Sequence, residues 1–409
     1  MNVCTDRYNF TLGFAASLVR GKVSLLPSTH TPEVIRQLTV FAPDAFCLTD
    51  DPKCDIALPR TYFPELTAFP EITAEVMAGL TVPAIDSQQL AAYVFTSGST
   101  GTPLPYKKTW GRLLRCVHNG ARRLGLLDGR THTIVGTVPA QHMYGFESSV
   151  LLGLQTGSAL CAERPFYPAD ICSVLASAPR PRVLISTPVH LRALLSAGMP
   201  LPETDLIVSA TAPLSHDLAR DVEAVFATRL LEIYGSTETG QIATRRTAET
   251  AEWQLWPGVT LTLKEDGHAW AQGGHVEQPT PMCDVLELTT EDRFLLHGRM
   301  ADLVNIAGKR SSLAYLNHQL SSIRGVVDGT FFFPDESPAS RTGVTRVAAF
   351  VVAPDLDAAT LTEELRRRID PVFLPRPLIF VAKLPRNGTG KLPQEALREL
   401  AARHLRSPT

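Results

Sequence analysis

Short apolar runs alternate with longer amphipathic segments along the first 250 residues of the chain. The apolar runs predict buried strands at 23–26, 45–48, 93–95, 132–138, 159–162, 183–186, 206–209 and 230–234, and helical patterns at 32–40, 112–127, 144–154, 169–176 and 216–227 lie between many of them. This alternation predicts an α/β fold with a mainly parallel sheet covered by helices on both faces. Because ligands bind such sheets beyond the carboxyl ends of the strands, the loops after the strands are searched first.

The pattern changes twice in the second half of the chain. Shorter alternating runs at 260–264, 285–288 and 293–297, with Gly and Pro between them, predict a small β subdomain over 253–298. Beyond residue 302, strands at 330–333, 347–352 and 378–381 and helices at 360–369 and 394–405 predict a small α+β domain. We therefore expect an N-terminal domain over 1–301 and a C-terminal domain over 302–409.

Composition and charge exclude several classes of protein. The 39 basic side chains nearly balance the 41 acidic ones, so neither nucleic acid nor an anionic membrane is an expected partner. Seven scattered cysteines without a CxxC pair argue against a metal cluster or a disulfide framework. The apolar run 10–19 is flanked by charges and lacks a cleavage site, and no run of about 18 apolar residues occurs. We expect a cytoplasmic protein; its oligomeric state is left open.

The first candidate site follows directly after the predicted strand 93–95. It reads Thr96-Ser97-Gly98-Ser99-Thr100-Gly101-Thr102-Pro103. Glycines allow the backbone to approach a phosphate with its N–H groups, and the hydroxyls add donors. The segment lacks the GxxxxGK[ST] spacing of a P-loop. Taken alone, it could equally be a flexible surface turn.

A second candidate site closes the strand 230–234 and reads Tyr234-Gly235-Ser236-Thr237-Glu238. A tyrosine at a strand end can stack on a purine, and a carboxylate beside hydroxyls can hold Mg²⁺, which takes its other ligands from phosphate and water. The alternative is a turn with a helix cap. Two further segments are the glycine-rich 298–302 and 385–391, of which the second ends in Lys391, a cation that can reach a phosphate or remain solvated.

These four segments, in this order and at these wide separations, resemble the core motifs of the adenylate-forming superfamily. That superfamily includes acyl-CoA and aryl-CoA synthetases, nonribosomal adenylation domains and luciferases. Residues 96–103 match its phosphate loop, 234–238 its Tyr-Gly-x-Thr-Glu motif, 298–302 its hinge motif and 385–391 its C-terminal lysine motif. The resemblance covers the chain from about residue 10 to its end.

The resemblance implies the superfamily fold with a shortened N-terminus: a large AMP-binding domain and a small mobile lid domain that rotates about the hinge Asp302. It implies ATP and Mg²⁺, acyl-AMP formation and transfer of the acyl group to a thiol. Lys391 would bridge the carboxylate and the phosphate, Thr237 would hold phosphate oxygens and Glu238 the metal ion. The residues expected to bind ATP are Thr96, Ser97, Gly98, Ser99, Thr100, Gly101, Ala210, Thr211, Ala212, Tyr234, Gly235, Ser236, Asp284 and Arg299.

The acid is expected beside the segment 138–145, which resembles the superfamily's Pro-x-x-His-x-x-Gly segment. His142 then counts among the catalytic residues, and the candidate pocket walls are His142, Met143, Tyr144 and Phe146. An aromatic and partly polar lining suits a hydroxylated benzoate. For Phe146, a place in the hydrophobic core is an equally good interpretation.

The sequence also departs from the superfamily pattern. Leu104 stands where the phosphate loop is often followed by Lys, and either Lys107 or Lys108 could supply that charge. Asn305 replaces a Lys in the hinge segment, and Cys283 replaces the Gly before Asp284.

The small length of the chain and its segment 304–313 resemble the ligases of bacterial aryl-polyene and xanthomonadin pigment biosynthesis. This narrower resemblance implies that a starter acid such as 3-hydroxybenzoate is loaded onto an acyl carrier protein. Arginines at 366–368 could meet an acidic carrier, although such stretches are more often solvated helix faces. The alternatives are a ligase that uses free coenzyme A, which presents the same thiol, and a degenerate homologue that binds nucleotide without turnover.

Overall fold

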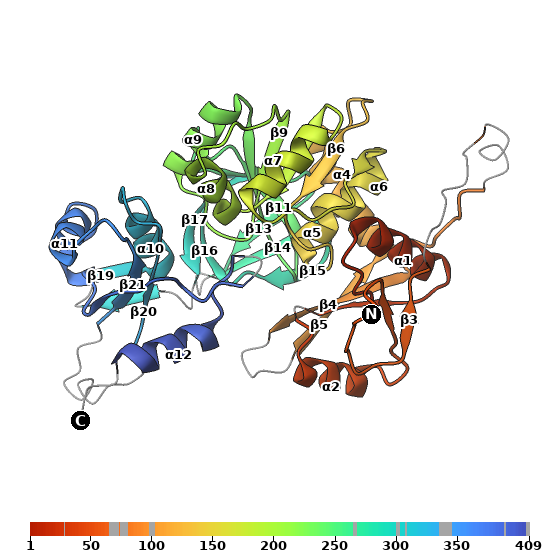
Figure 1. Ribbon diagram of the computed structural model, residues 1–409, viewed down its shortest axis with the longest axis horizontal. Helices are drawn as coiled ribbons and strands as arrows, with labels where there is room; N and C mark the ends of the chain where they lie inside the picture. Colours follow the sequence, from red (N-terminus) through yellow and green to blue (C-terminus); the bar gives the residue numbers. More distant parts are fainter. Residues whose placement is uncertain are drawn as a thin grey trace.

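The computed structural model describes residues 1–27, 29–64, 73, 81–97, 103–264, 268–299, 303–306, 309–334, 346–387 and 390–405. A large N-terminal part holds most of the helices and strands, and a small C-terminal unit stands beside it at the left of Figure 1. Within the described part of the chain, no helix has both the length and the apolar character needed to cross a membrane.

A nine-stranded sheet, in the order β16-β17-β12-β11-β10-β9-β8-β6-β7, forms the centre of the N-terminal part. Its parallel half consists of β6 (Thr133–Gly136), β7 (Ala159–Leu160), β8 (Arg182–Ser186), β9 (Leu206–Ser209) and β10 (Leu230–Ser236). The strands predicted from apolar runs at 132–138, 159–162, 183–186, 206–209 and 230–234 are confirmed here. The antiparallel half consists of β11 (Gly240–Arg245), β12 (Trp253–Leu255), β16 (Asp284–Thr290) and β17 (Arg293–Arg299).

Helices cover both faces of the parallel half, because neighbouring residues of each strand point to opposite faces. Val135, Leu184 and Ile207 pack in one core with α7 (Pro168–Ser177), α8 (Pro188–Ser196) and α9 (His216–Phe226). Ile134, Ile185 and Val208 pack in the other core with α1 (Arg7–Val19) and α4 (Trp110–Leu124). The hydrophobic pattern did not predict α1, α8 or α10 (Leu313–Ser321).

The helical segment predicted at 144–154 is not a regular helix. It consists of α5 (Met143–Gly145), a π-helical stretch over Phe146–Leu151 and α6 (Leu152–Thr156). π-Helical turns are rare and often lie at functional sites. Both Glu147 and Ser148, on this stretch, are buried and point to polar partners.

The segment expected to form one small β subdomain is divided between two sheets. Strands β13 (Thr260–Leu263), β14 (Ala269–Gly273) and β15 (Val276–Pro281) form a sheet of their own. Strands β12, β16 and β17 instead extend the central sheet, so the expected single unit over 253–298 is wrong. Alternation of apolar and polar residues predicts a strand but does not say which sheet it joins.

A three-stranded sheet near the N-terminus carries the predicted phosphate loop. Its strands are β1 (Ser24–Leu26), β4 (Leu90–Ser97) and β5 (Pro103–Thr109), and β4 pairs antiparallel with β5 so that Ser97 lies opposite Pro103. Next to this sheet are α2 (Pro32–Phe41) and the pair β2 (Cys47–Thr49) and β3 (Arg60–Tyr62).

The C-terminal unit has its own core around Leu316, Phe331 and Leu361. It contains β18 (Leu303–Ile306), β19 (Lys309–Ser312), α10, β20 (Asp328–Phe332), β21 (Ala348–Val352), α11 (Ala358–Arg366), β22 (Leu378–Phe380) and α12 (Gln394–Leu405). The unit contacts the N-terminal part through Arg192, whose Nη1 donates to the carbonyl of Val327 at 3.1 Å. Such contacts fix where the C-terminal loops lie relative to the central sheet.

Candidate functional site

The turn between β10 and β11 is built by its own hydroxyls. The backbone N–H groups of Ser236 and Thr239 each donate to the other residue's hydroxyl oxygen at 3.2 Å. Gly240 ends the turn with φ +77°, a conformation that favours glycine. A Cβ at Gly235 would lie 2.2 Å from the carbonyl oxygen of Gly240, so the chain can close only without a side chain there. The turn therefore presents Thr237 and Glu238 in one fixed shape.

Tyr106 of β5 connects this turn to the strand that carries the phosphate loop. Its phenol group forms side-chain hydrogen bonds with both Glu238 and Thr96, and burial followed by the charge of Glu238 raises the pKa of Tyr106. Thr96 and Glu238, far apart in the sequence, are thereby brought to one place. The predicted loop residues Gly98, Ser99, Thr100 and Gly101 lie outside the described residues, as does the side chain of Ser97.

Tyr234 and Asp284 form a second part of the site. The Tyr234 hydroxyl donates to Oδ2 of Asp284 at 2.5 Å, and its ring packs against Trp253 and Phe294. Asp284 begins β16, directly opposite Arg299 of β17 in the strand register. Tyr234 therefore orients the carboxylate of Asp284 through its hydroxyl, while its ring belongs to the core.

The backbone at the end of β9 has an unusual conformation. Thr211 has φ +81°, a left-handed conformation that is strained for a β-branched residue. It lies between Ala210 and Ala212, at the carboxyl end of the strand next to β10. Strained residues of this kind are concentrated at binding sites. The three residues predicted to face adenine thus occupy the same edge of the sheet as Tyr234.

The charge of Lys391 acts on His142, although the two residues belong to different parts of the fold. Burial, and then the charge of Lys391, lowers the pKa of His142 to about 4, so the imidazole is neutral at physiological pH. The Nδ1 atom of His142 accepts from the N–H of Tyr144 at 3.3 Å and caps α5. The charge of Lys391 is therefore felt at the predicted acid pocket.

The turn that carries Lys391 is held from both domains. Oδ1 of Asn387 accepts from the N–H of Lys391 at 2.9 Å, and Arg386 makes two 2.7 Å bonds to Asp328. A Cβ at Gly390 would lie 2.9 Å from Cγ2 of Val189, at the start of α8. The turn thus lies directly on the N-terminal part.

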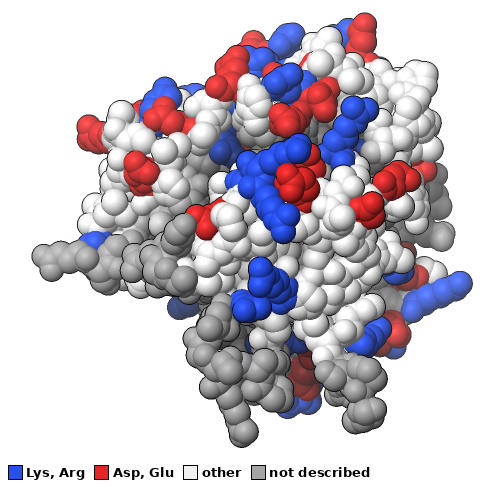
Figure 2. Space-filling view, turned by 90° about the vertical axis from the view of Figure 1, so that its left-hand side faces the viewer, with Lys and Arg blue, Asp and Glu red and all other residues white. Residues whose placement is uncertain are grey.

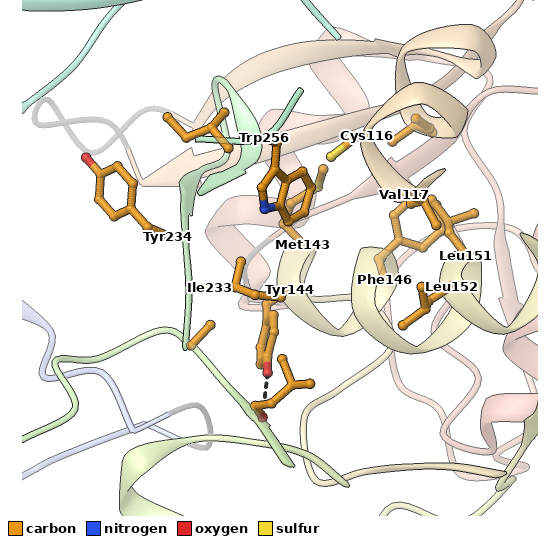
Figure 3. Close-up of a cluster of buried hydrophobic side chains, with 14 of the residues drawn as sticks. Cys116, Val117, Met143, Tyr144, Phe146, Leu151, Leu152, Ile233, Tyr234 and Trp256 are labelled. Atoms are coloured by element: carbon orange, nitrogen blue, oxygen red, sulfur yellow. Dashed lines mark hydrogen bonds between the residues drawn. The ribbon is translucent and has the colours of Figure 1, made fainter. Parts of the chain in front are cut away.

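Figure 3 shows three of the residues that were predicted to line the acid pocket, with Phe146 apart from Met143 and Tyr144. Met143 and Tyr144 point toward Ile233 and Trp256, and the Tyr144 hydroxyl donates to the carbonyl of Val208 at 3.0 Å. Phe146 points the other way, is fully buried, and meets Phe14 edge-to-face at 4.9 Å. The prediction that Phe146 lines the pocket is therefore wrong, because the π-helical stretch turns it into the core.

Three charged residues beneath the β10–β11 turn were not predicted to have a role there. Nζ of Lys108 donates to the carbonyl of Thr237, and Nη2 of Arg112 donates to the carbonyl of Glu238. Glu147 is buried beside them. The sequence offered one signal, the pair of lysines that follows the phosphate loop. It could not tell that Lys107 is exposed and Lys108 is buried.

The remaining predicted residues concern the hinge and the metal ion. Asp302 and the side chain of Arg299 lie outside the described residues. Among the described residues, no group of three or more His, Cys, Asp or Glu side chains is placed to hold a metal ion. Glu238 alone, half-buried and hydrogen-bonded to Tyr106, suits Mg²⁺, which takes few protein carboxylates and fills its shell with phosphate oxygens and water.

Comparisons with known proteins show which proteins this chain resembles. The family model described as AMP-binding enzyme matches residues 27–284. A 4-coumarate–CoA ligase of Rhodobacter capsulatus is 32% identical over 315 residues, which are 75% of this chain and 76% of the relative. A fatty acid–[acyl-carrier-protein] ligase of Mycobacterium marinum is 23% identical and covers 88% of this chain and 80% of its own length.

Solved structures confirm the fold class. O-succinylbenzoate coenzyme A synthetase from Bacillus subtilis, in complex with ATP and a magnesium ion, superposes with a TM-score of 0.77 at 17% identity. The match covers 98% of this chain and 88% of that protein. The predicted α/β fold with its separate small C-terminal unit is thereby confirmed.

Proposed function

Because the chain belongs to the AMP-binding enzyme family of AMP-forming acid–thiol ligases, we propose that it activates an aromatic carboxylic acid as its acyl-AMP. It then passes the acyl group to the phosphopantetheine thiol of an acyl carrier protein. The observation that supports the proposal is the placement of the Lys391 turn, which packs on Val189 of the N-terminal part and brings the charge of Lys391 close enough to lower the pKa of His142.

The first half-reaction joins two anions. A carboxylate oxygen attacks the α-phosphorus of ATP, pyrophosphate leaves, and an acyl-AMP anhydride forms. Positive charge and preorganised donors at the α-phosphate lower this barrier most. Lys391 would lie between the carboxylate and the phosphate, with Thr237 and the segment 96–101 holding phosphate oxygens.

The nucleotide would lie along the carboxyl edge of the sheet. Asp284, oriented by Tyr234, would accept hydrogen bonds from the ribose hydroxyls, and the strained 210–212 backbone would face adenine. Glu238 would hold Mg²⁺, which supplies charge neutralisation on the phosphates. The 210–212 segment and the Thr237–Glu238 turn follow the carboxyl ends of β9 and β10, where ligands of α/β sheets bind, and Asp284 is joined to them through Tyr234.

The acid would lie between Lys391 and the side chains of His142, Met143 and Tyr144. A neutral imidazole, a thioether and a buried aromatic ring favour a flat, weakly polar substrate over an ammonium-bearing amino acid. A benzoate or cinnamate that carries a hydroxyl group has this character.

Thiol transfer requires Lys391 to leave. The thiol must reach the carbonyl carbon that the ammonium group faces during activation, so the C-terminal unit would rotate about Asp302 between the two steps. The contacts of Arg192 and of Gly390 with the other part of the fold would then belong to the arrangement used for activation.

The acceptor is the least constrained part of the proposal. The arginines of α11 are paired with acidic neighbours, as Arg367 is with Glu364 at 2.9 Å and Arg366 with Glu363 at 3.5 Å. Figure 2 shows basic and acidic side chains next to one another on that side of the molecule. These arginines are therefore poor evidence for a carrier-protein surface, and the preference for a carrier rests on the sequence resemblance.

One set of assays tests the proposal. Pyrophosphate release is measured with hydroxybenzoates, cinnamates and short fatty acids, and the best acid is then offered with holo-acyl carrier protein or free coenzyme A. Aromatic-acid-dependent release with faster transfer to the carrier is the expected result. Faster transfer to coenzyme A would make the protein a coenzyme A ligase. Absence of acid-dependent ATP–pyrophosphate exchange would identify a degenerate homologue.

A further inference from the structure

A buried group of charges lies directly beneath the β10–β11 turn. Lys108 is 1% exposed and Glu147 is 3% exposed, and Cys116 is buried between them and β11. Charged side chains are rarely buried, because removing them from water costs free energy unless each is paired and hydrogen-bonded. The elements that meet here are β5, α4, the π-helical stretch and β11.

The two cations of this group both donate to the backbone of the turn. Lys108 holds the carbonyl of Thr237, and Arg112 holds the carbonyl of Glu238. These are the two residues to which the proposed function assigns the phosphate oxygens and the metal ion. Neither carbonyl can rotate away without leaving the buried Lys108 or the half-buried Arg112 short of an acceptor.

Glu147 supplies the opposing charge. Burial raises its pKa to about 6, and the charge of Lys108 opposes that shift; burial lowers the pKa of Lys108 to about 8. Oε1 of Glu147 also accepts from Sγ of Cys116 at 3.3 Å. A Cβ at Gly240 would approach this oxygen to 3.1 Å, so the end of the turn and the carboxylate are packed against each other.

We propose that Lys108 and Arg112, with Glu147 as their counter-charge, are positioning residues that fix the Thr237–Glu238 backbone in the shape that binds MgATP. The inference rests on the proposed function, since it assigns Thr237 and Glu238 to the nucleotide. It also gives a role to the lysine that follows the phosphate loop here: with Leu104 in the usual lysine position, Lys108 acts from below the turn and not on a phosphate.

The first test compares Lys108→Met with Lys107→Met. The control changes the same charge one residue away, on the exposed face of β5. We expect Lys108→Met to slow ATP–pyrophosphate exchange about 100-fold, as a small misplacement of catalytic groups does. Transfer from supplied acyl-AMP to the thiol should change little, because it needs neither the metal ion nor the leaving pyrophosphate. An equal loss in the control would overturn the proposal.

A double variant separates positioning from stability. Lys108→Met alone leaves Glu147 buried without its main opposing charge and should lower the Tm. Lys108→Met combined with Glu147→Gln removes both charges, and its Tm should return most of the way to that of the wild type. We expect the double variant to remain slow in exchange. Recovery of both the Tm and the exchange rate would show that Lys108 has only a structural role.

MgATP binding distinguishes failure of this inference from failure of the proposed function. The affinity for MgATP, measured by calorimetry without any acid, should fall about tenfold or more in the double variant relative to the wild type. If the wild type binds MgATP but activates no acid, the proposed function fails. The comparison of MgATP affinity between the wild type and the double variant would still decide whether Lys108 is a positioning residue. Equal affinity in both proteins would refute the inference.

Discussion

Replacement of Lys391 by alanine should separate the two half-reactions. The turn that carries Lys391 is closed by hydrogen bonds between Asn387 and the backbone N–H and carbonyl groups of Lys391. The substitution therefore removes the ammonium group and leaves the turn in place. Loss of one preorganised donor at a developing charge typically costs about 2.7–4 kcal/mol, or roughly 10²–10³ in rate. The Lys391 side chain is exposed before substrates bind, so solvent weakens its charge. We therefore expect the rate of acyl-AMP formation to fall about 10²-fold, at the lower end of this range.

The assay measures each half-reaction separately. ATP–pyrophosphate exchange reports acyl-AMP formation, and transfer from supplied acyl-AMP to the thiol should stay within about threefold of wild type. Lys383→Ala, an exposed lysine of the same domain, is the matched control and should leave both steps unchanged.

A titration checks the geometry independently of turnover. Since the Lys391 charge lowers the pKa of His142, Lys391→Ala should raise that pKa from about 4, as followed by NMR of the imidazole. It should remain below the ordinary value of about 6.5, because burial is the larger cause. Equal loss of both half-reactions, or an unchanged His142 pKa, would refute the placement of Lys391 at the acid.

Three further substitutions test other parts of the site. Tyr234→Phe removes the donor that orients Asp284 and should raise the KM for ATP about tenfold. Tyr144→Phe, the control, loses a hydrogen bond to a neutral carbonyl and should leave that KM unchanged. Equal effects of the two substitutions would contradict the role of Asp284 in ribose binding. Arg386→Ala removes the ion pair that supports the Lys391 turn and should slow exchange more than thiol transfer, which single-turnover rates would show. Burial lowers the pKa of His275 to about 3, so the unfolded chain takes up a proton first as the pH falls below 6.5, and this residue alone should cost about 3 kcal/mol of stability at pH 4.5. Urea denaturation at pH 7 and 4.5 should show a smaller decline for His275→Leu, and parallel declines would contradict this reasoning.

The sequence located most strands of the parallel half because a buried strand needs a continuous apolar run. Leu206–Ser209 is an example: all four residues are buried, and the predicted bounds match the strand. The segment 144–154 shows the limit of such patterns. Its periodicity predicts one helix, but the pattern does not distinguish a π-helical stretch, which decides that Phe146 faces the core and Glu147 the turn.

The order and chemistry of the motifs were determined by the sequence alone. Hydroxyls and glycines after one strand, Tyr-Gly-Ser-Thr-Glu after another and a late lysine are residue types that suit phosphate and Mg²⁺. The resemblance of this ordered series to the adenylate-forming superfamily is what implied adenylate chemistry. Only the tertiary structure decided which groups act on one another: the charge of Lys391 on His142, the hydroxyl of Tyr234 on Asp284, and Lys108 on the carbonyl of Thr237. The physical reason is that contacts between distant segments depend on how whole elements pack and on which of two neighbouring lysines a strand turns inward. The local pattern of hydrophobic residues determines neither.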